Sequence, residues 1–232
     1  MEKFPISLYP SVTPNPYTIK FMSDRYLLQP KQGSADFRTK EEADGFSPLA
    51  SAVFEQFDYI KGVYIERNFI SVTKDEGAMP WEYLIPEVRD FLHSYIVNGN
   101  PIVNHMPEER AFPKVKDMEF SPSPFDGKIR ELMKTHVDDP VREDGGQIVY
   151  RGFKDGIVTV LLKGACVGCP ARNKTLKQGI EDILIRYIPE VKEVVSENDL
   201  LEEENNIATS SDGGKSPFDQ LDFSAFDSLP EI

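Results

Sequence analysis

The chain has 232 residues, of which 40% are hydrophobic, and this is enough for one large domain or two small ones. Its net charge of −13 argues against non-specific nucleic-acid binding, which depends on neutralising phosphates, and no apolar run approaches the roughly 20 residues that span a bilayer. The opening residues Met1–Pro5 have neither the apolar core of a signal peptide nor an arginine-rich leader. We therefore expect a cytoplasmic protein with no nucleic-acid or membrane partner.

The first predicted domain covers residues 12–98 and mixes helices with strands. Four short strands are expected, at residues 18–21, 26–28, 63–65 and 69–73. A helix is expected to start at Ser47 and Pro48, because the serine oxygen can accept hydrogen bonds from unpaired amides and proline suits the first helical position. A second amphipathic helix is expected over residues 84–96, with Trp81 as a core or interface anchor. This domain contains no catalytic constellation.

A linker is predicted over residues 99–123. Proline at this density removes backbone donors and interrupts helices, so we expect at most partial order. The prolines that punctuate this region and its far edge are Pro101, Pro107, Pro113, Pro122 and Pro124.

The second predicted domain covers residues 124–196. A first helix near residues 129–137 should end at Asp139-Pro140. Strands follow at 147–150 and 157–162, joined through Lys154-Asp-Gly156 as a hairpin; a helix over 176–188 and an edge strand at 191–195 complete the domain. The sequence thus predicts an α+β protein of two small mixed domains, the second with the order α-β-β-α-β.

The remaining residues, 197–232, form an acidic tail. Ten acidic residues stand there against one base, Lys215. Such a segment buries too little apolar surface to offset its ordering entropy, so we expect disorder. A short docking motif remains the alternative, because five apolar residues alternate with the acids: Phe218, Leu221, Phe223, Phe226 and Leu229.

The two cysteines, Cys166 and Cys169, are the most informative residues of the chain. They lie between the second strand and the second helix of the C-terminal domain. Two thiolates are half of the four that a tetrahedral zinc site or an iron–sulfur cluster usually requires, and the other soft ligands are only His93, His105 and His136. The count indicates a metal centre shared by two copies, or redox chemistry that needs only the pair.

The surroundings of the pair suit a thiolate. Pro170 can open the second helix, which would place Cys169 at a helix N-terminus, where the partial positive charge favours the thiolate. Gly164 and Gly168 leave room for a bulky inorganic ligand. Positive charge gathers nearby, at Lys163, Arg172, Lys174 and Lys177.

The sequence resembles a known family at both ends. The C-terminal domain of NifU-like (Nfu-type) iron–sulfur cluster scaffold proteins is closely similar to Asp144-Gly-Gly146, Phe153-Lys-Asp-Gly-Ile157, Leu162-Lys-Gly-Ala-Cys-Val-Gly-Cys-Pro170, Thr175-Leu-Lys-Gln-Gly-Ile-Glu181 and Tyr187-Ile-Pro-Glu-Val191. The N-terminal domain of many such scaffolds resembles Thr13-Pro-Asn-Pro16, Ile19-Lys-Phe21, Ser47-Pro-Leu49 and Asn68-Phe-Ile-Ser-Val-Thr-Lys74 followed by Trp81. One departure is Gln147, where an acidic residue is expected.

The resemblance implies a carrier rather than an enzyme. It implies that Cys166 and Cys169 of two protomers bind a [4Fe–4S] cluster between them, and that the cluster passes to apo iron–sulfur proteins. Upstream cluster-assembly proteins would be further partners. No acid–base or nucleophile constellation accompanies the thiols, in line with a protein that does not catalyse turnover.

Two other classes stay open on the residues alone. A thiol–disulfide oxidoreductase of the thioredoxin type also has CxxC between strand and helix, but Gly164-Ala165 replaces the usual aromatic residue before the first cysteine. A zinc-bridged interaction module would use the same thiolates, since zinc and iron–sulfur clusters both accept four.

Overall fold

The computed structural model describes residues 5–29, 32–107, 122–170 and 173–198. The described residues belong to one compact unit that ends at Asn198, and everything below concerns this unit. Residues 199–232 of the predicted tail and 108–121 of the predicted linker lie outside the described residues. Within the described ranges, no helix is both long enough and apolar enough to cross a membrane.

The N-terminal domain is built on a five-stranded antiparallel sheet, with the strand order β1-β2-β5-β4-β3. Its strands are β1 (Leu8–Val12), β2 (Thr18–Ser23), β3 (Ala35–Phe37), β4 (Ile60–Glu66) and β5 (Phe69–Lys74). Strands β4 and β5, at two of the predicted strand positions, form a hairpin around Arg67 and Asn68, with Glu66 paired to Phe69. The predicted mixed α and β class is confirmed.

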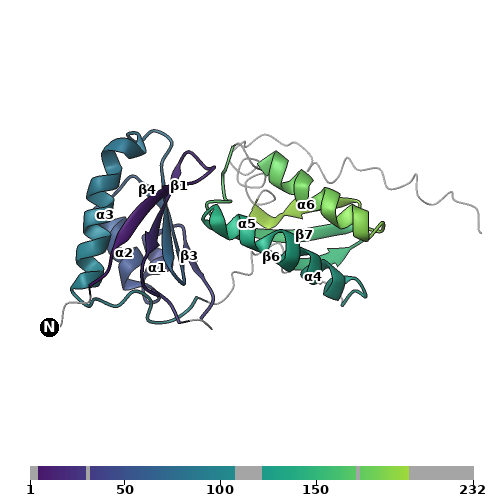
Figure 1. Ribbon diagram of the computed structural model, residues 1–232, viewed down its shortest axis with the longest axis horizontal. Coiled ribbons are helices and arrows are strands. Elements are labelled where there is room, and N and C mark those ends of the chain that lie inside the picture. The colour runs from purple at the N-terminus through teal and green to yellow at the C-terminus, as the bar shows by residue number, and fades with distance from the viewer. Residues whose placement is uncertain (1–4, 30–31, 108–121, 171–172, 199–232) are drawn as a thin grey trace, which may run out of the picture. The chain divides into compact units, whose positions relative to one another are not determined.

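Three helices complete this domain: α1 (Lys40–Ala43), α2 (Pro48–Gln56) and α3 (Trp81–Val97). Helix α2 starts as predicted, since the Ser47 hydroxyl oxygen accepts a hydrogen bond from Ala50 N at 3.1 Å and Pro48 is the first helical residue. Trp81 begins α3 and is buried in the domain core, as expected for an anchor. Helices α2 and α3 lie along one face of the sheet (Figure 1).

Residues 26–28 were predicted as a strand, and this is wrong. The amides of Leu27 and Leu28 both donate to one carbonyl, Arg67 O, so no ladder forms there. The prediction also missed the two edge strands, β1 and β3. Strand β1 contains Pro10, which an edge tolerates because its missing N–H needs no ladder partner.

The C-terminal domain has a three-stranded sheet, β6 (Gly146–Lys154), β7 (Ile157–Gly164) and β8 (Glu193–Ser196), in that order. The predicted hairpin is confirmed: β6 and β7 are antiparallel, and Asp155 and Gly156 turn the chain with φ of 54° and 89°. Strand β8 is the predicted edge strand and runs parallel to β7.

Three helices cover one face of this sheet: α4 (Asp126–His136), α5 (Asp138–Glu143) and α6 (Asn173–Tyr187). Helix α4 ends at His136, before Asp139-Pro140 as predicted, but the prediction missed α5, a separate short helix that contains both residues. Proline fits there since the first-turn amides of a helix have no partner within it. Buried side chains of the helices and of the sheet pack together in this core, among them Ile129, Met133, Leu184, Val158, Val160 and Leu162.

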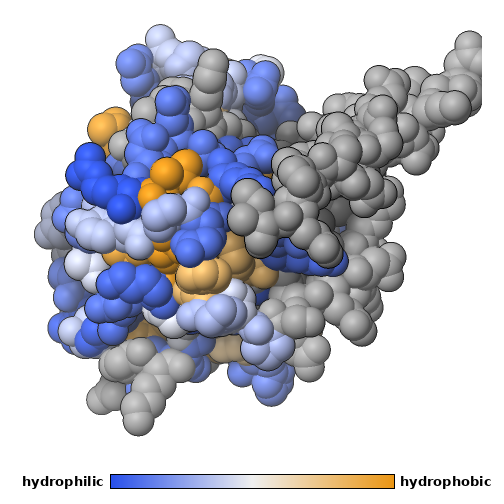
Figure 2. All heavy atoms as spheres, turned by 90° about the vertical axis from the view of Figure 1, so that its right-hand side faces the viewer, coloured by the Kyte–Doolittle hydropathy of each residue, from blue (hydrophilic) through white to orange (hydrophobic). Residues whose placement is uncertain are grey.

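The surface is mainly hydrophilic on the face shown in Figure 2, with small, separate hydrophobic patches. Among the described residues of the C-terminal domain, the large apolar side chains that stay exposed are Ile157, Ile185 and Tyr187.

Glu197 and Asn198, which the prediction assigned to the tail, are part of the folded domain. Glu197 is 0% exposed, and Arg151 Nε donates to its Oε1 at 3.0 Å. The Asn198 side chain accepts from Leu162 N at 2.8 Å and donates to Leu162 O at 3.2 Å, which continues the ladder beside β7. Counting charges placed Glu197 with the acidic stretch, but its buried ion pair makes it part of the fold.

Glu197→Ala should lower the free energy of unfolding by about 3 kcal/mol, because it leaves the Arg151 guanidinium without its buried partner. A chain that ends at Asn198 should stay within about 0.5 kcal/mol of the full chain, since it keeps this ion pair. Urea unfolding followed by circular dichroism measures both. Equal losses in the two variants would contradict this boundary.

Candidate metal centre

Both cysteines lie in one tight turn that follows β7, at the predicted strand-to-helix junction. The turn is closed by hydrogen bonds from Cys166 N to Lys163 O at 3.4 Å and from Val167 N to Gly164 O at 3.2 Å. Gly164 and Gly168 adopt positive φ, 61° and 62°, a region that glycine enters without strain. The glycines thus shape the turn itself, besides leaving the space expected from the sequence.

The helix that follows begins later than predicted. Helix α6 starts at Asn173, so Pro170 is not its first residue and Cys169 does not lie in its first turn. Residues 171–172 are outside the described residues. Of the four predicted bases, Lys163 and Lys177 are half-buried, whereas the side chains of Arg172 and Lys174 are outside the description.

The thiols are covered rather than open. Cys166 is 7% exposed and Cys169 is 1% exposed, and no disulfide joins them. Cys166 packs into the core of the C-terminal domain and lies against the backbone of Gly146, where an added Cβ would come within 2.5 Å of its Sγ. Gly146 therefore leaves the space that this thiol occupies, a role that the sequence alone did not reveal.

The turn between β1 and β2 lies over the same thiols. Cys169 Sγ contacts Pro14 O at 3.7 Å, and Asn15 Nδ2 donates to Ala165 O at 3.0 Å and to Val167 O at 3.2 Å. A cavity of about 10 Å³ remains between this turn and the cysteines; it is lined by Pro14, Asn15, Asp144, Ala165, Cys166 and Cys169. Asn15 belongs to Thr13-Pro-Asn-Pro16, which the sequence marked only as a resemblance.

The donors present in one copy remain two thiols. Over the described ranges, no three histidine, cysteine, aspartate or glutamate side chains are grouped so that they could bind a metal ion. The histidines are exposed and lie elsewhere: His93 in α3, His105 after it, and His136 at the end of α4, stacked on Tyr187 with ring centroids 6.2 Å apart. Among the described residues, these thiols therefore offer two of the four ligands of such a centre.

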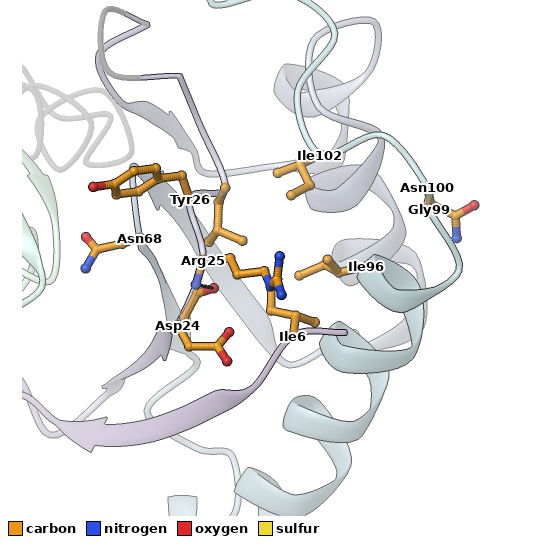
Figure 3. Close-up of a pocket in the computed structure, with 11 residues that line it drawn as sticks. Ile6, Asp24, Arg25, Tyr26, Asn68, Ile96, Gly99, Asn100 and Ile102 are labelled. Carbon is orange, nitrogen blue, oxygen red and sulfur yellow. Dashed lines mark hydrogen bonds between the residues drawn. The ribbon is translucent and has the colours of Figure 1, made fainter. Parts of the chain in front are cut away.

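A larger hollow, of about 830 Å³, lies on the N-terminal domain and is lined by neither cysteine nor histidine. Figure 3 shows Asp24, Arg25 and Tyr26 on one side of it, with Ile96 of α3 and Ile102 on the other. The Asp24 carboxylate already takes part in a hydrogen bond within the domain, since its Oδ1 accepts from Ser7 N at 2.9 Å. The hollow has no donor set for a soft metal.

Replacing Gly146 should disturb the thiol turn. Gly146→Ala places a methyl carbon 2.5 Å from Cys166 Sγ and 2.8 Å from Lys163 O, so the turn must shift, and bound iron per chain after anaerobic reconstitution should fall at least about tenfold. Gly179→Ala is the matched control, because nothing lies within 4 Å of its added Cβ; it should keep full loading. Unchanged loading in Gly146→Ala would refute this packing argument.

Comparison with known proteins agrees with the two domains. Residues 129–195 match the family model of the NifU-like domain, and residues 8–99 match that of the Nfu/NifU scaffold protein N-terminus. A human protein named "NFU1 iron-sulfur cluster scaffold homolog, mitochondrial" is 35% identical over 78% of this chain and 68% of its own length.

Two further relatives give the same picture. A NifU-like protein of Schizosaccharomyces pombe is 35% identical over 82% of this chain and 72% of its own length. NifU-like protein 4, mitochondrial, of Arabidopsis thaliana is 34% identical over 84% of this chain and 68% of its own length. The human and plant relatives are named mitochondrial, which contradicts the cytoplasmic location expected from the sequence. The opening residues alone do not determine where the protein works.

Proposed function

Because the chain belongs to the family of Nfu-type, NifU-like iron–sulfur cluster scaffold proteins, we propose that two copies hold a [4Fe–4S] cluster between them and deliver it to apo iron–sulfur proteins. The observation that carries the proposal is the pairing of Cys166 and Cys169 in one turn. Each copy offers two thiolates, and four-iron clusters take four, so two turns facing each other complete the ligand set.

The cluster is cargo in this proposal. A preassembled cluster is handed over by exchanging its thiolate ligands, so the chain has to hold and release it and needs no acid–base machinery. We therefore propose a carrier rather than an enzyme. The same two thiolates per copy would also suit zinc, but the names of the relatives favour iron–sulfur cargo.

The thiol–disulfide alternative is less well supported. Gly164-Ala165 stands where a thioredoxin-type enzyme usually has an aromatic residue before its first cysteine, and the relatives are named as cluster scaffolds. We propose partners that fit the carrier role instead: apo iron–sulfur proteins as acceptors, upstream assembly proteins as donors, and a second copy of the chain. The relatives' names support a mitochondrial location.

Reconstitution tests the ligand count. Anaerobic loading with iron and sulfide should give about one four-iron cluster per two chains, seen by native mass spectrometry together with broad visible absorption. Cys166→Ser and Cys169→Ser should each abolish stable loading while circular dichroism stays unchanged. A single chain that keeps a full cluster without added small thiols would disprove the shared centre, and a colourless dimer that holds one metal ion would favour zinc.

Delivery has its own test. Loaded protein mixed with an apo four-iron enzyme should restore that enzyme's activity, and an iron chelator present in excess should change the yield by less than about twofold if the cluster passes directly between thiolates. An equal amount of free iron and sulfide in the same chelator is the control and should restore none. Loss of transfer in the chelator would mean that the chain only releases iron.

A further inference from the structure

The N-terminal sheet buries polar side chains on the face turned away from its helices. Lys20 on β2 is 6% exposed and Ser71 on β5 is 1% exposed, although their neighbours Ile19, Phe21 and Ile70 already fill the helix-covered core. Side chains of a strand alternate between faces, so Lys20 and Ser71 point to the opposite side. What covers them there is the cysteine-bearing end of the C-terminal domain.

Polar side chains of the N-terminal domain donate to backbone carbonyls at that end. Ser71 Oγ donates to Gly145 O at 2.8 Å, and Lys20 Nζ donates to Glu143 O. Desolvation is the main cause that lowers the pKa of Lys20, so its ammonium group is held out of water. A buried cation and a buried hydroxyl are stable here because both are hydrogen-bonded across the contact.

Asn15 binds the cysteine turn itself, through Ala165 O and Val167 O. Its own position is fixed, because Thr13 Oγ1 accepts from Asn15 N at 3.2 Å and Asn15 Oδ1 accepts from Tyr17 N at 3.0 Å. The side-chain amide of Asn15 is therefore oriented before the two domains meet. Little side-chain conformational entropy is lost when the contact forms.

Shape and charge match across the same contact. The Tyr64 ring lies so close to Gly164 that an added Cβ would come within 2.8 Å of it, so only glycine admits the ring. At the edge, Arg142 Nε donates to Glu66 Oε1 at 2.9 Å. Burial raises the pKa of Glu66, and the Arg142 guanidinium opposes that rise.

We propose that the N-terminal domain is a cap for the cysteine turn, and we call Asn15, Lys20, Tyr64, Glu66 and Ser71 the cap face. In the closed state this face shields both thiols from solvent oxidants and alkylating reagents. The remaining cavity of about 10 Å³ holds one water at most, far less than a cube of iron and sulfide. Capping and a cluster shared by two copies therefore exclude each other.

Closure is intramolecular, since both domains belong to one chain. The effective concentration of a tethered domain is high, so the cap reseats without a binding partner. Loading a cluster then requires the cap to lift, and release of the cluster lets it return. The chain alternates between a shielded state without cargo and an open state that carries it.

Alkylation of the full-length apo-protein tests the shielding. Asn15→Ala combined with Ser71→Ala removes three hydrogen bonds of the cap face and should speed the reaction of both thiols with iodoacetamide at least about tenfold. Asn100→Ala is the matched control, an exposed asparagine away from the cap face, and should react at the wild-type rate. Equal rates in all three proteins, with both thiols reacting, would overturn the cap.

Reversing the charges of the Arg142–Glu66 ion pair distinguishes opening of the cap from unfolding of the protein. Arg142→Glu places two carboxylates across the edge, so the cap should open and alkylation should quicken several-fold. Adding Glu66→Lys restores opposite charges and should return the rate toward that of the wild type. A thermal melt on each protein separates opening from unfolding, and failure of the second change to slow the reaction at an unchanged melting temperature would count against the cap.

A test of cluster loading rests on the proposed function, whereas the alkylation tests do not. In anaerobic reconstitution the Asn15→Ala, Ser71→Ala protein should take up its cluster faster than the wild type at the same final stoichiometry. Equal uptake rates, despite faster alkylation, would mean that the cap does not compete with the cluster. If neither protein loads a cluster, the proposed function fails while the shielding result still stands.

Discussion

At the open end of the β6–β7 hairpin, Gly146 and Gly164 face each other without side chains, and the site depends on this pair. Gly146 is paired with Gly164, so the chain can turn back from β7 with Cys166 pressed against the Gly146 backbone. The neighbouring carbonyl, Gly145 O, accepts from Ala165 N within the turn and from Ser71 Oγ. A side chain at Gly146 would displace the Cys166 thiol, and a side chain at Gly164 would displace the Tyr64 ring.

This packing explains why a small domain can present two thiols and still protect them. The turn is closed by hydrogen bonds between neighbouring backbone groups. The thiols themselves supply only half of the ligands of a four-iron cluster. Under the proposed function, assembly of the centre would require two molecules to meet, which would suit a carrier whose cargo has to leave again.

Local patterns were enough to predict several elements of this fold. The start of α2 at Ser47 and Pro48, and the hairpin through Gly156, depend on residues that are neighbours in sequence. The position of the cysteines between β7 and α6 followed in the same way. Contacts between distant residues could not be predicted: Asn15 meets Ala165 across 150 positions, and Glu197 is buried beside Arg151, 46 positions earlier. The edge strand β3 likewise becomes a strand by pairing with β4.

The bonds that Asn15, Lys20 and Ser71 make across the contact all end on main-chain carbonyls. Hydrogen bonds to main-chain carbonyls depend on the path of the backbone and not on which side chain each residue carries. Point changes at Ala165 or Val167 should therefore leave these bonds in place, whereas inserting or deleting a single residue in the turn would shift the carbonyls out of register. The length of the cysteine turn is then constrained along with its two glycines, and a turn of equal length that keeps Gly164 and Gly168 could be grafted in without redesigning the sheet beneath it.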